Sequence, residues 1–497
     1  MSYFSRNKDF SWKLAAALVL FLVNVLNIAN PLLEQHSFRQ TQTAISVFYL
    51  IKDGFILDYI TPVLGRGYAI PFEFPIFHFI VAFLSKYLFI PLDISGLLTS
   101  LLFAIGALAV NDLLLKEIGV DKRARLFAFL LICCSPVFLF WSGTFMIESA
   151  ALFLCLASFL YAAKYLKFQN NIYLLLWFCC ATLALLQKVT TGLFPYLFCC
   201  SGIVNLFYTG KKNSLLSRVF ILLFVACPII IAYAWVIHTD ALKSANPVAL
   251  VKLTSSALSG WNYGTLEQRL SASFWLNNLY QRGLAPSALM GLGFLLTILV
   301  VFFSSMQRRL KLIVSAFIFL YFLPQLTFAN LFVVHNYYHY AVIIYLCNAI
   351  AISYFYIGCS HERIIKYLVV ISCICSLVYF SKDYRQSKFG HIKDSYKTIA
   401  ISKEIQRQLE GEDVFILFGY DWSSEIAYYS ERKALSVPEW YLDRFDIDSV
   451  DRYFDRPPKL IVICNNADKK YDLFIPRMSK YYLDKELEDC SFFKKRS

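Results

Sequence analysis

The chain has 497 residues, of which 58% are hydrophobic and only 16% are charged. Soluble globular chains are about half apolar and about a quarter charged, so this composition excludes a soluble protein and indicates a membrane protein with some polar substructure. The net charge of +13 does not indicate nucleic-acid binding, because the Lys and Arg residues stand in short clusters between apolar runs, as topology signals do.

Eleven apolar runs are long enough, or nearly so, to cross a bilayer, which takes about 20 residues. No cleavable signal follows the first run, so we expect it to be a retained helix. The sequence therefore predicts an all-α polytopic membrane protein with about 11 transmembrane helices. The runs lie near residues 13–30, 95–115, 126–142, 149–165, 172–187, 190–208, 218–238, 284–305, 311–329, 340–358 and 365–381.

A further run, FPIFHFIVAFLSKYLF at 74–89, is short and carries His78 and Lys86. If it spans the membrane, the basic cluster at 116–125 lies opposite the basic N-terminus. If it lies in the interface, all basic clusters share one side, which the positive-inside rule assigns to the cytoplasm. We prefer the second arrangement, which makes 31–94 a first external loop with juxtamembrane helices. The basic clusters are MSYFSRNK, KEIGVDKRAR, KYLKFQNN, KKNSLLSR, MQRRLK and HERIIK.

The segment after Lys382 is more charged than the rest of the chain. Its runs VFILFGYDW and KLIVICNNAD predict short buried strands, and SSEIAYYSERKAL between them predicts an amphipathic helix or a hairpin. We expect a transmembrane domain at 1–381 and a small external α/β domain at 382–497. Cys464 and Cys490 could pair if this domain lies outside the reducing cytosol.

Directly after the first span, the stretch LLEQHSFRQTQTA (32–44) concentrates polar groups at the membrane edge. If 32–50 is a helix, Glu34 lies at its start, and His36, Arg39 and Gln40 share one face. The alternative is a solvated interfacial helix whose Arg39 reaches the lipid headgroups. The mixture of Glu, His, Arg and Gln with almost no Lys favours a functional site.

Two further external segments carry carboxylates. Glu73 lies between Pro71 and Pro75 in a stretch that must be extended, and it is either a structural anchor or a substrate contact. Glu148 and Lys188 lie near the outer ends of predicted spans. Because unpaired charges there are costly, they pair with each other or with a charged ligand, and the sequence leaves both options open.

The segment HNYYHY at the outer start of a span holds His335, Tyr337 and Tyr338. These side chains are donors for a phosphate, or else part of an aromatic belt. The sequence contains no Gly-rich phosphate loop, no dinucleotide fingerprint, no HExxH and no nucleophile elbow. It therefore predicts no cofactor and leaves metal dependence open.

The order of these elements resembles the integral-membrane glycosyltransferases of the GT-C type, in the branch of protein O-mannosyltransferases and the lipid A aminoarabinose transferase. HSFRQTQTA resembles a His-Ser-Trp-Arg-Gln element of a bacterial subgroup, with Phe38 in place of Trp, and FEFPIFHF resembles its Phe-Glu-Phe-Pro segment. LLQKVTTG and HNYYHY resemble two further elements of that subgroup. The resemblance covers most of residues 1–390.

The resemblance implies an inverting transfer of a sugar from a polyprenyl-phosphate donor to a glycan, lipid or protein acceptor at the external face of a bacterial inner membrane. The family's catalytic acid maps onto Glu34, although many relatives carry Asp there, and whether His36 shares the role of base stays open. For the donor phosphate, the implied contacts are Arg39, Lys188, His335, Tyr337 and Tyr338. For the sugar or acceptor, they are Gln40, Glu73 and Glu148.

The implied partners are the donor lipid, the bilayer and the acceptor, with no nucleic acid. The alternative function is a polytopic transporter or glycolipid flippase. That function requires polar residues deep within several spans, whereas the predicted spans have apolar middles with ionisable groups near their outer ends. The sequence names neither the sugar nor the acceptor.

Overall fold

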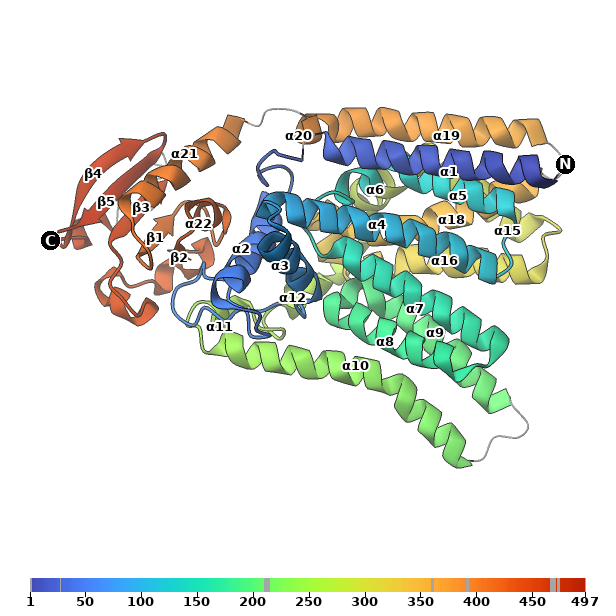
Figure 1. Cartoon of the computed structure of the whole chain (residues 1–497), viewed down its shortest axis with the longest axis horizontal. Coiled ribbons are helices and arrows are strands. Elements are labelled where there is room, and N and C mark those ends of the chain that lie inside the picture. The colour runs from blue at the N-terminus through green and yellow to red at the C-terminus, as the bar shows by residue number, and fades with distance from the viewer. Residues whose placement is uncertain are drawn as a thin grey trace. The chain divides into compact units, whose positions relative to one another are not determined.

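The structure is a computed structural model that describes residues 2–26, 28–209, 215–358, 362–389, 393–464, 471 and 474–496. It is mostly helical, with a small sheet near the C-terminus (Figure 1). The chain forms two compact units. The first comprises Met1–Ile28, Leu97–Ala234 and Ser259–Gly390, and the second comprises Ala29–Gly96, Trp235–Leu258 and His391–Ser497. The segment predicted to be the first external loop and the C-terminal segment thus belong to one unit, while the domain boundary near residue 382 stays a prediction.

The first unit is a helical bundle, and helices α4 (Leu92–Glu117) and α10 (Leu215–Ser244) contribute residues to both units. Its core is made of Leu, Ile, Ala and aromatic side chains that are almost completely buried. Its other helices are α1 (Ser2–Val25), α5 (Lys122–Cys134), α6 (Pro136–Trp141), α7 (Glu148–Phe168), α8 (Asn171–Gln187), α9 (Val189–Thr209), α12 (Ser259–Tyr263), α13 (Leu266–Leu270), η1 (Phe274–Leu284), α14 (Ala285–Ser287), α15 (Leu292–Phe303), α16 (Arg308–Thr327), α17 (Ala329–Val334), η2 (Asn336–Tyr338), α18 (His339–Gly358), α19 (Glu362–Asp383) and α20 (Arg385–Phe389).

Six helices in the described part of the chain are long and apolar enough to cross a membrane, and a pair bent by 87° would make seven. The predicted polytopic all-α class with a small C-terminal α/β part is confirmed. The count is lower than 11 because several expected spans are short or broken. Ser135, which precedes Pro136, is extended and ends α5, so the run at 126–142 is two helices. The run at 284–305 bends sharply between α14 and α15.

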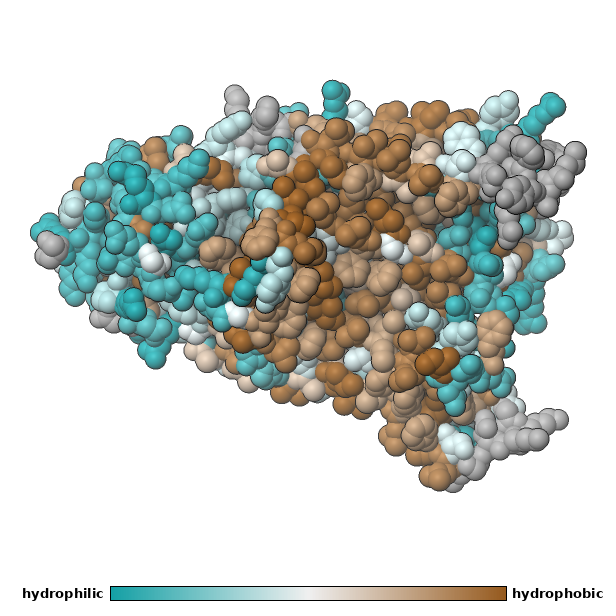
Figure 2. All heavy atoms as spheres, in the orientation of Figure 1, coloured by the Kyte–Doolittle hydropathy of each residue, from teal (hydrophilic) through white to brown (hydrophobic). Residues whose placement is uncertain are grey.

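The loops that carry four of the predicted basic clusters meet at one end of the first unit. Figure 2 shows mostly apolar side chains over the visible face of its helices, with hydrophilic ones gathered at this end. This grouping agrees with the positive-inside arrangement. Residues 211–214 of KKNSLLSR and His361 of HERIIK lie outside the described residues. Three polar contacts join the loops: Lys122–Asp9 at 2.5 Å, Lys167–Glu117 at 2.8 Å, and Arg309 to the carbonyl of Ile118 at 3.1 Å.

The second unit contains a five-stranded mixed sheet in the order β2-β1-β3-β5-β4. β1 pairs in parallel with β2 and β3, whereas β5 pairs antiparallel with β3 and β4. The predicted buried strands are confirmed as β1 and β3; residues 465–468 of KLIVICNNAD lie outside the described residues. The elements are α2 (Ser37–Asp53), α3 (Ile76–Leu88), α11 (Ala249–Lys252), α21 (Lys393–Gln408), β1 (Val414–Phe418), α22 (Glu425–Ser430), β2 (Lys433–Ser436), η3 (Glu439–Arg444), η4 (Ile447–Tyr453), β3 (Leu460–Cys464), η6 (Ile475–Arg477), β4 (Tyr481–Leu487) and β5 (Cys490–Lys495).

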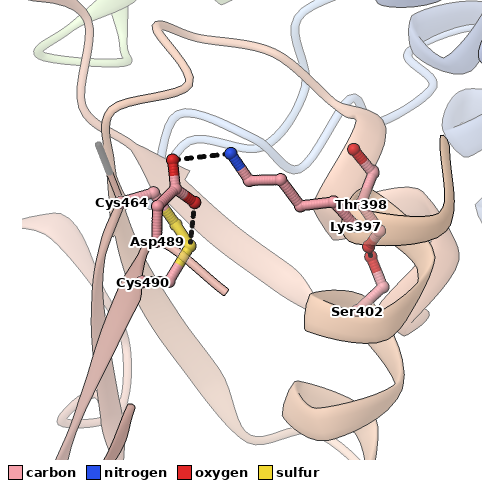
Figure 3. The surroundings of a disulfide bond; sticks show 6 residues. All are labelled: Lys397, Thr398, Ser402, Cys464, Asp489 and Cys490. Carbon is pink, nitrogen blue, oxygen red and sulfur yellow. Dashed lines mark hydrogen bonds and ion pairs between the residues drawn. A yellow bond between two sulfur atoms is a disulfide. The ribbon is translucent and has the colours of Figure 1, made fainter. Parts of the chain in front are cut away.

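Cys464 and Cys490 form a disulfide (Figure 3). They are direct partners in the antiparallel register of β3 and β5, and their Cα atoms are 4.0 Å apart. Beside the disulfide, the Lys397 ammonium forms an ion pair with Asp489 at 2.6 Å and so joins α21 to the sheet. The disulfide therefore links β5, the last strand of the chain, to β3 at the centre of the sheet.

Residues 31–94, the predicted first external loop, contain helices α2 and α3. The helix expected over 32–50 begins only at Ser37, because His36 adopts a left-handed backbone conformation (φ 51°, ψ 39°) that stops it from extending toward Pro31. α3 has 13 residues and is therefore about 20 Å long, shorter than the roughly 30 Å hydrocarbon core. This length fits a juxtamembrane helix, and Lys86 of α3 donates to the carbonyl of Ile51 in α2 at 3.2 Å.

Candidate functional site

The predicted site residues fall into both compact units, and each unit holds its own polar cluster. The first unit contains Glu148, Lys188, His335, Tyr337 and Tyr338. The second contains Glu34, His36, Arg39, Gln40 and Glu73.

The cluster in the first unit lies at the end opposite the basic loops. Glu148 is the first residue of α7, and Lys167 stands in its last turn. A helix of 21 residues is about 30 Å long, which matches the thickness of the hydrocarbon core of a bilayer. The two ends of α7 are therefore suited to opposite membrane faces.

Lys188 lies between two helices, as the extended residue (φ −164°, ψ 104°) that separates α8 from α9. Its ammonium forms an ion pair with Oε1 of Glu148, and both side chains are buried, with exposed fractions of 9% and 3%. The other carboxylate oxygen, Oε2, has no hydrogen-bond partner among the described residues. Of the two partners that the sequence left open for these charges, the structure thus shows pairing with each other. Oε2 of Glu148 could still accept a hydrogen bond from a ligand.

Aromatic rings cover the Lys188 ammonium. It lies 5.0 Å from the ring centroid of Tyr337 and 4.2 Å from that of Tyr338, distances typical of cation–π contacts. The two tyrosine rings stack on each other at 4.7 Å, and the His335 ring stacks on Tyr337 at 5.3 Å. All five predicted residues of this unit therefore belong to one cluster of a cation, a carboxylate and three rings.

In the second unit, Arg39 of α2 forms an ion pair with Glu73 and donates a second hydrogen bond to Gln42, one turn further along the helix. Both charged side chains are 17% exposed. The Tyr59 hydroxyl fixes the segment around Glu73, since it donates to the Glu73 carbonyl at 3.1 Å and accepts from the Phe72 N–H at 3.0 Å. Glu73 thus bonds to Arg39 from a segment that was expected to be extended and that has a bend at Glu73 in the structure.

His78 of α3 packs on Tyr59, which bonds to the Glu73 carbonyl, and is buried. Its ring is 4.8 Å from the ring of Tyr59. Burial, with a smaller contribution from the positive charge of Arg39, lowers the pKa of His78 to about 3. His78 is therefore a neutral packing residue at neutral pH.

Lys243, near the end of α10, joins this cluster although the sequence analysis did not single it out. Its side chain is buried, and its ammonium lies 4.9 Å from the ring centroid of Phe72. The guanidinium carbon of Arg39 lies 5.9 Å from the same centroid, and Asp240 is 3.9 Å from Lys243. The sequence did contain a signal for Lys243, because a lysine at the predicted outer end of a span is unusual under the positive-inside rule.

Glu34, His36 and Gln40 lie in and next to the segment that precedes α2. Glu34 is partly buried, and its carbonyl accepts from the N–H of Ser37 at 3.0 Å. Gln40 is fully buried and donates to the carbonyl of Gln35 at 3.2 Å. The expectation that His36 shares a helix face with Arg39 and Gln40 is wrong, because His36 precedes the helix.

The residues that the structure describes contain no group of three His, Cys, Asp or Glu side chains suited to a metal ion. Cations, carboxylates and aromatic rings are the chemical groups of the two clusters. Such groups can bind an anion, accept a proton and stack on a ligand.

No protein-family model matches the chain, and no curated protein matches it. Several solved structures do match the chain. A structure of ArnT from Cupriavidus metallidurans bound to undecaprenyl phosphate is 13% identical with a TM-score of 0.63, and the match covers 97% of each chain. The archaeal oligosaccharyltransferase AglB from Archaeoglobus fulgidus, in complex with an inhibitory peptide and a dolichol-phosphate, is 11% identical with a TM-score of 0.56, covering 97% of this chain and 73% of that one.

A mycobacterial arabinofuranosyltransferase, AftD, is 12% identical with a TM-score of 0.58, and the match covers 98% of this chain but 40% of that one. These proteins are glycosyltransferases of the GT-C fold. Identity at this level shows the fold alone, and this chain has the GT-C fold across nearly its whole length. The fold expected from the sequence resemblance is confirmed.

Proposed function

We propose that this protein is an inverting glycosyltransferase that moves a sugar from a polyprenyl-phosphate donor to an acceptor of the cell envelope, at the external face of a bacterial inner membrane. The observation that carries the proposal is the likeness, over 97% of both chains, to a structure that binds undecaprenyl phosphate. The two polar clusters supply the chemistry that such a reaction needs.

The donor leaves behind a phosphate that gains negative charge as the glycosidic bond breaks, so the site must stabilise an anion. Arg39 and Lys243 offer two cations around Phe72 in the second unit, and Lys188 of the first unit is a separate candidate. An ammonium has three N–H donors, so Lys188 can bind Glu148 and a phosphate oxygen together. His335, Tyr337 and Tyr338 are further candidate contacts for the donor.

A hydroxyl acceptor must lose a proton as it attacks, and a carboxylate within hydrogen-bond reach serves as the base. Glu34 is the candidate, with His36 beside it in the left-handed turn before α2. Gln40, Glu73 and Glu148 are candidate contacts for the sugar or the acceptor. Inversion follows if the acceptor attacks the anomeric carbon from the face opposite the departing phosphate.

Two observations support the external placement. The basic loops gather at the end of the first unit opposite Glu148, and the Cys464–Cys490 disulfide is typical of an oxidising compartment. Protease added to intact spheroplasts should therefore remove the C-terminal segment. Protection of that segment would overturn the placement.

The donor can be tested by native mass spectrometry of the purified full chain. Undecaprenyl phosphate should bind, and undecaprenol, which lacks the phosphate, should bind far more weakly. Glu34→Gln should retain this binding but abolish sugar transfer to envelope acceptors, whereas the exposed Glu410→Gln should behave like the wild type. Wild-type turnover in Glu34→Gln would refute the assignment of the base.

One observation favours a second candidate function, a transporter or glycolipid flippase. The pair Phe274–Ser287 and Leu292–Phe303 is bent by 87°, and discontinuous helices are common at the binding sites of transporters. Movement of a glycolipid across proteoliposomes in the absence of any acceptor would support this function.

A further inference from the structure

Helix α22 of the C-terminal segment contacts the loop that carries Glu34, and both belong to the second compact unit. The N–H of Leu32 donates to the Tyr429 hydroxyl at 2.6 Å. Five residues later, the Ser37 hydroxyl donates to Glu425 Oε1 at 2.5 Å. Glu34 lies between these two contacts, so the loop is held on both sides of the candidate base.

The two contacts come from one face of α22. Glu425 and Tyr429 stand four residues apart, and side chains at this spacing are neighbours on a helix surface. The 32–37 loop therefore lies along a single helical turn, with its first and last residues bonded to that turn.

The start of α2 is fixed by the residues just before α22. The Ser424 hydroxyl bonds to Thr41 at 3.0 Å and donates to the carbonyl of Phe38 at 3.3 Å, and Ser424 and Thr41 are buried. The Phe38 and Trp422 rings pack edge to face at 4.7 Å. The contact between α22 and the loop thus continues onto the helix that carries Arg39.

The Asp93 carboxylate orients both tyrosines of α22. Tyr429 donates to its Oδ2 at 3.3 Å, and Tyr428 donates to its Oδ1. Because the Tyr429 proton goes to Asp93, its oxygen is the acceptor for the N–H of Leu32. Tyr428 donates to the same carboxylate, but the acceptor for the Leu32 N–H is Tyr429.

We propose that Tyr429 and Glu425 of α22 are positioning residues that hold the Glu34 loop in its reactive conformation, so that the C-terminal segment is part of the catalytic apparatus. The inference rests on the proposed function only for the role of Glu34. The hydrogen bonds that hold the loop lie within the second unit and do not depend on that role.

The experiment compares Tyr429→Phe with Tyr428→Phe in the full-length protein reconstituted in nanodiscs. Both variants lose one hydrogen bond to Asp93, but only Tyr429→Phe loses the acceptor for Leu32. Tyr429→Phe should lower kcat about 3- to 10-fold, the range of one lost hydrogen bond, with KM for the donor within about 2-fold. Tyr428→Phe should leave kcat within about 2-fold. Amide hydrogen exchange over 32–37 should accelerate only in Tyr429→Phe.

Equal kcat and equal exchange in the two variants would overturn the inference. If Tyr429→Phe does not fold, Ser37→Ala tests the other contact, because it removes only the bond to Glu425, and unchanged kcat and exchange there would count against the inference in the same way. Failure of the proposed function looks different. The wild type would then transfer no sugar, or Glu34→Gln would remain active, while the exchange result would still report on the loop.

Discussion

The Lys188 ammonium forms an ion pair with Glu148 while it lies 4.2 Å from the centre of the Tyr338 ring. Both charges are buried, and each therefore depends on the other for compensation.

Lys188→Met should destabilise the protein by about 3–5 kcal/mol, because it leaves the Glu148 carboxylate buried without a counter-charge. The double variant with Glu148→Gln should recover part of this loss. Thermal unfolding in detergent measures both. As a control, Lys52→Met breaks an ion pair that is about 40% exposed, and it should cost no more than about 1 kcal/mol. A double variant no more stable than Lys188→Met would contradict the pairing.

Arg39→Lys should raise KM for the proposed polyprenyl-phosphate donor about 10-fold. The guanidinium bonds to Glu73 and Gln42 from two nitrogens at once, and a lysine cannot reproduce this fork. Arg66→Lys is the matched control, because Arg66 forms an ion pair with Asp455 in which both side chains are more than 60% exposed. Donor titrations that give equal KM values for the two variants would count against a donor role for Arg39.

Lys243→Met should weaken binding of undecaprenyl phosphate while leaving binding of undecaprenol unchanged. Removing the ammonium takes away one of the two cations near Phe72 but keeps most of the side-chain volume. Lys252→Met, which removes a cation from the ring of Trp440 instead, is the control. Native mass spectrometry of both variants measures the difference, and equal affinities for the phosphate would exclude Lys243 as a phosphate contact.

His78 should make the protein sensitive to acid. Its pKa falls from 6.5 to about 3 on folding, so the stability it contributes is present above pH 6.5 and is lost as the pH falls toward 3. Between pH 7 and pH 4.5 this loss amounts to about 2–3 kcal/mol. His78→Phe should flatten the dependence, and His238→Gln, which changes an exposed histidine, should not. Thermal unfolding at pH 7 and pH 4.5 measures the change in stability for each variant. An equal loss of stability in the wild type and in His78→Phe would contradict the prediction.

Replacing Cys464 and Cys490 by Ala should destabilise the second unit by about 2–4 kcal/mol, since the disulfide closes a loop between residues 26 apart. The wild type, unfolded without reductant, should show no reaction of these two cysteines with a thiol-specific label. Labelling of both after unfolding would show that the bond is absent in the isolated protein.

Sequence patterns that depend on neighbouring residues predicted the fold well. The apolar runs became helices, and the continuous apolar runs at β1 and β3 became buried strands. β4 and β5 were not predicted. β4, with the sequence YYLDKEL, is charged and mostly exposed, so it has neither the alternation nor the apolar run of a typical strand.

The site was harder to predict, because it depends on contacts between distant segments. From the sequence, Lys188 and Glu148 could pair with each other or with a charged ligand, and in the structure they pair with each other. The left-handed turn at His36 was not predicted, because such a conformation is uncommon outside glycine. Lys243 was overlooked because it stands alone at the end of a span. The roles of Glu34 and the other site residues stay predictions until the variants are measured.

The contact between Leu32 and Tyr429 joins residues 397 positions apart, and it has a consequence for how the protein is made. During synthesis the Glu34 loop leaves the ribosome long before α22 exists, and domains form as their residues become available. The hydrogen bonds from α22 to the loop can therefore form only after most of the helices have been inserted. If Tyr429 and Glu425 position Glu34 as proposed, an incomplete chain would insert into the membrane yet lack an ordered Glu34 loop, and sugar transfer would begin only after the last hundred residues have been made.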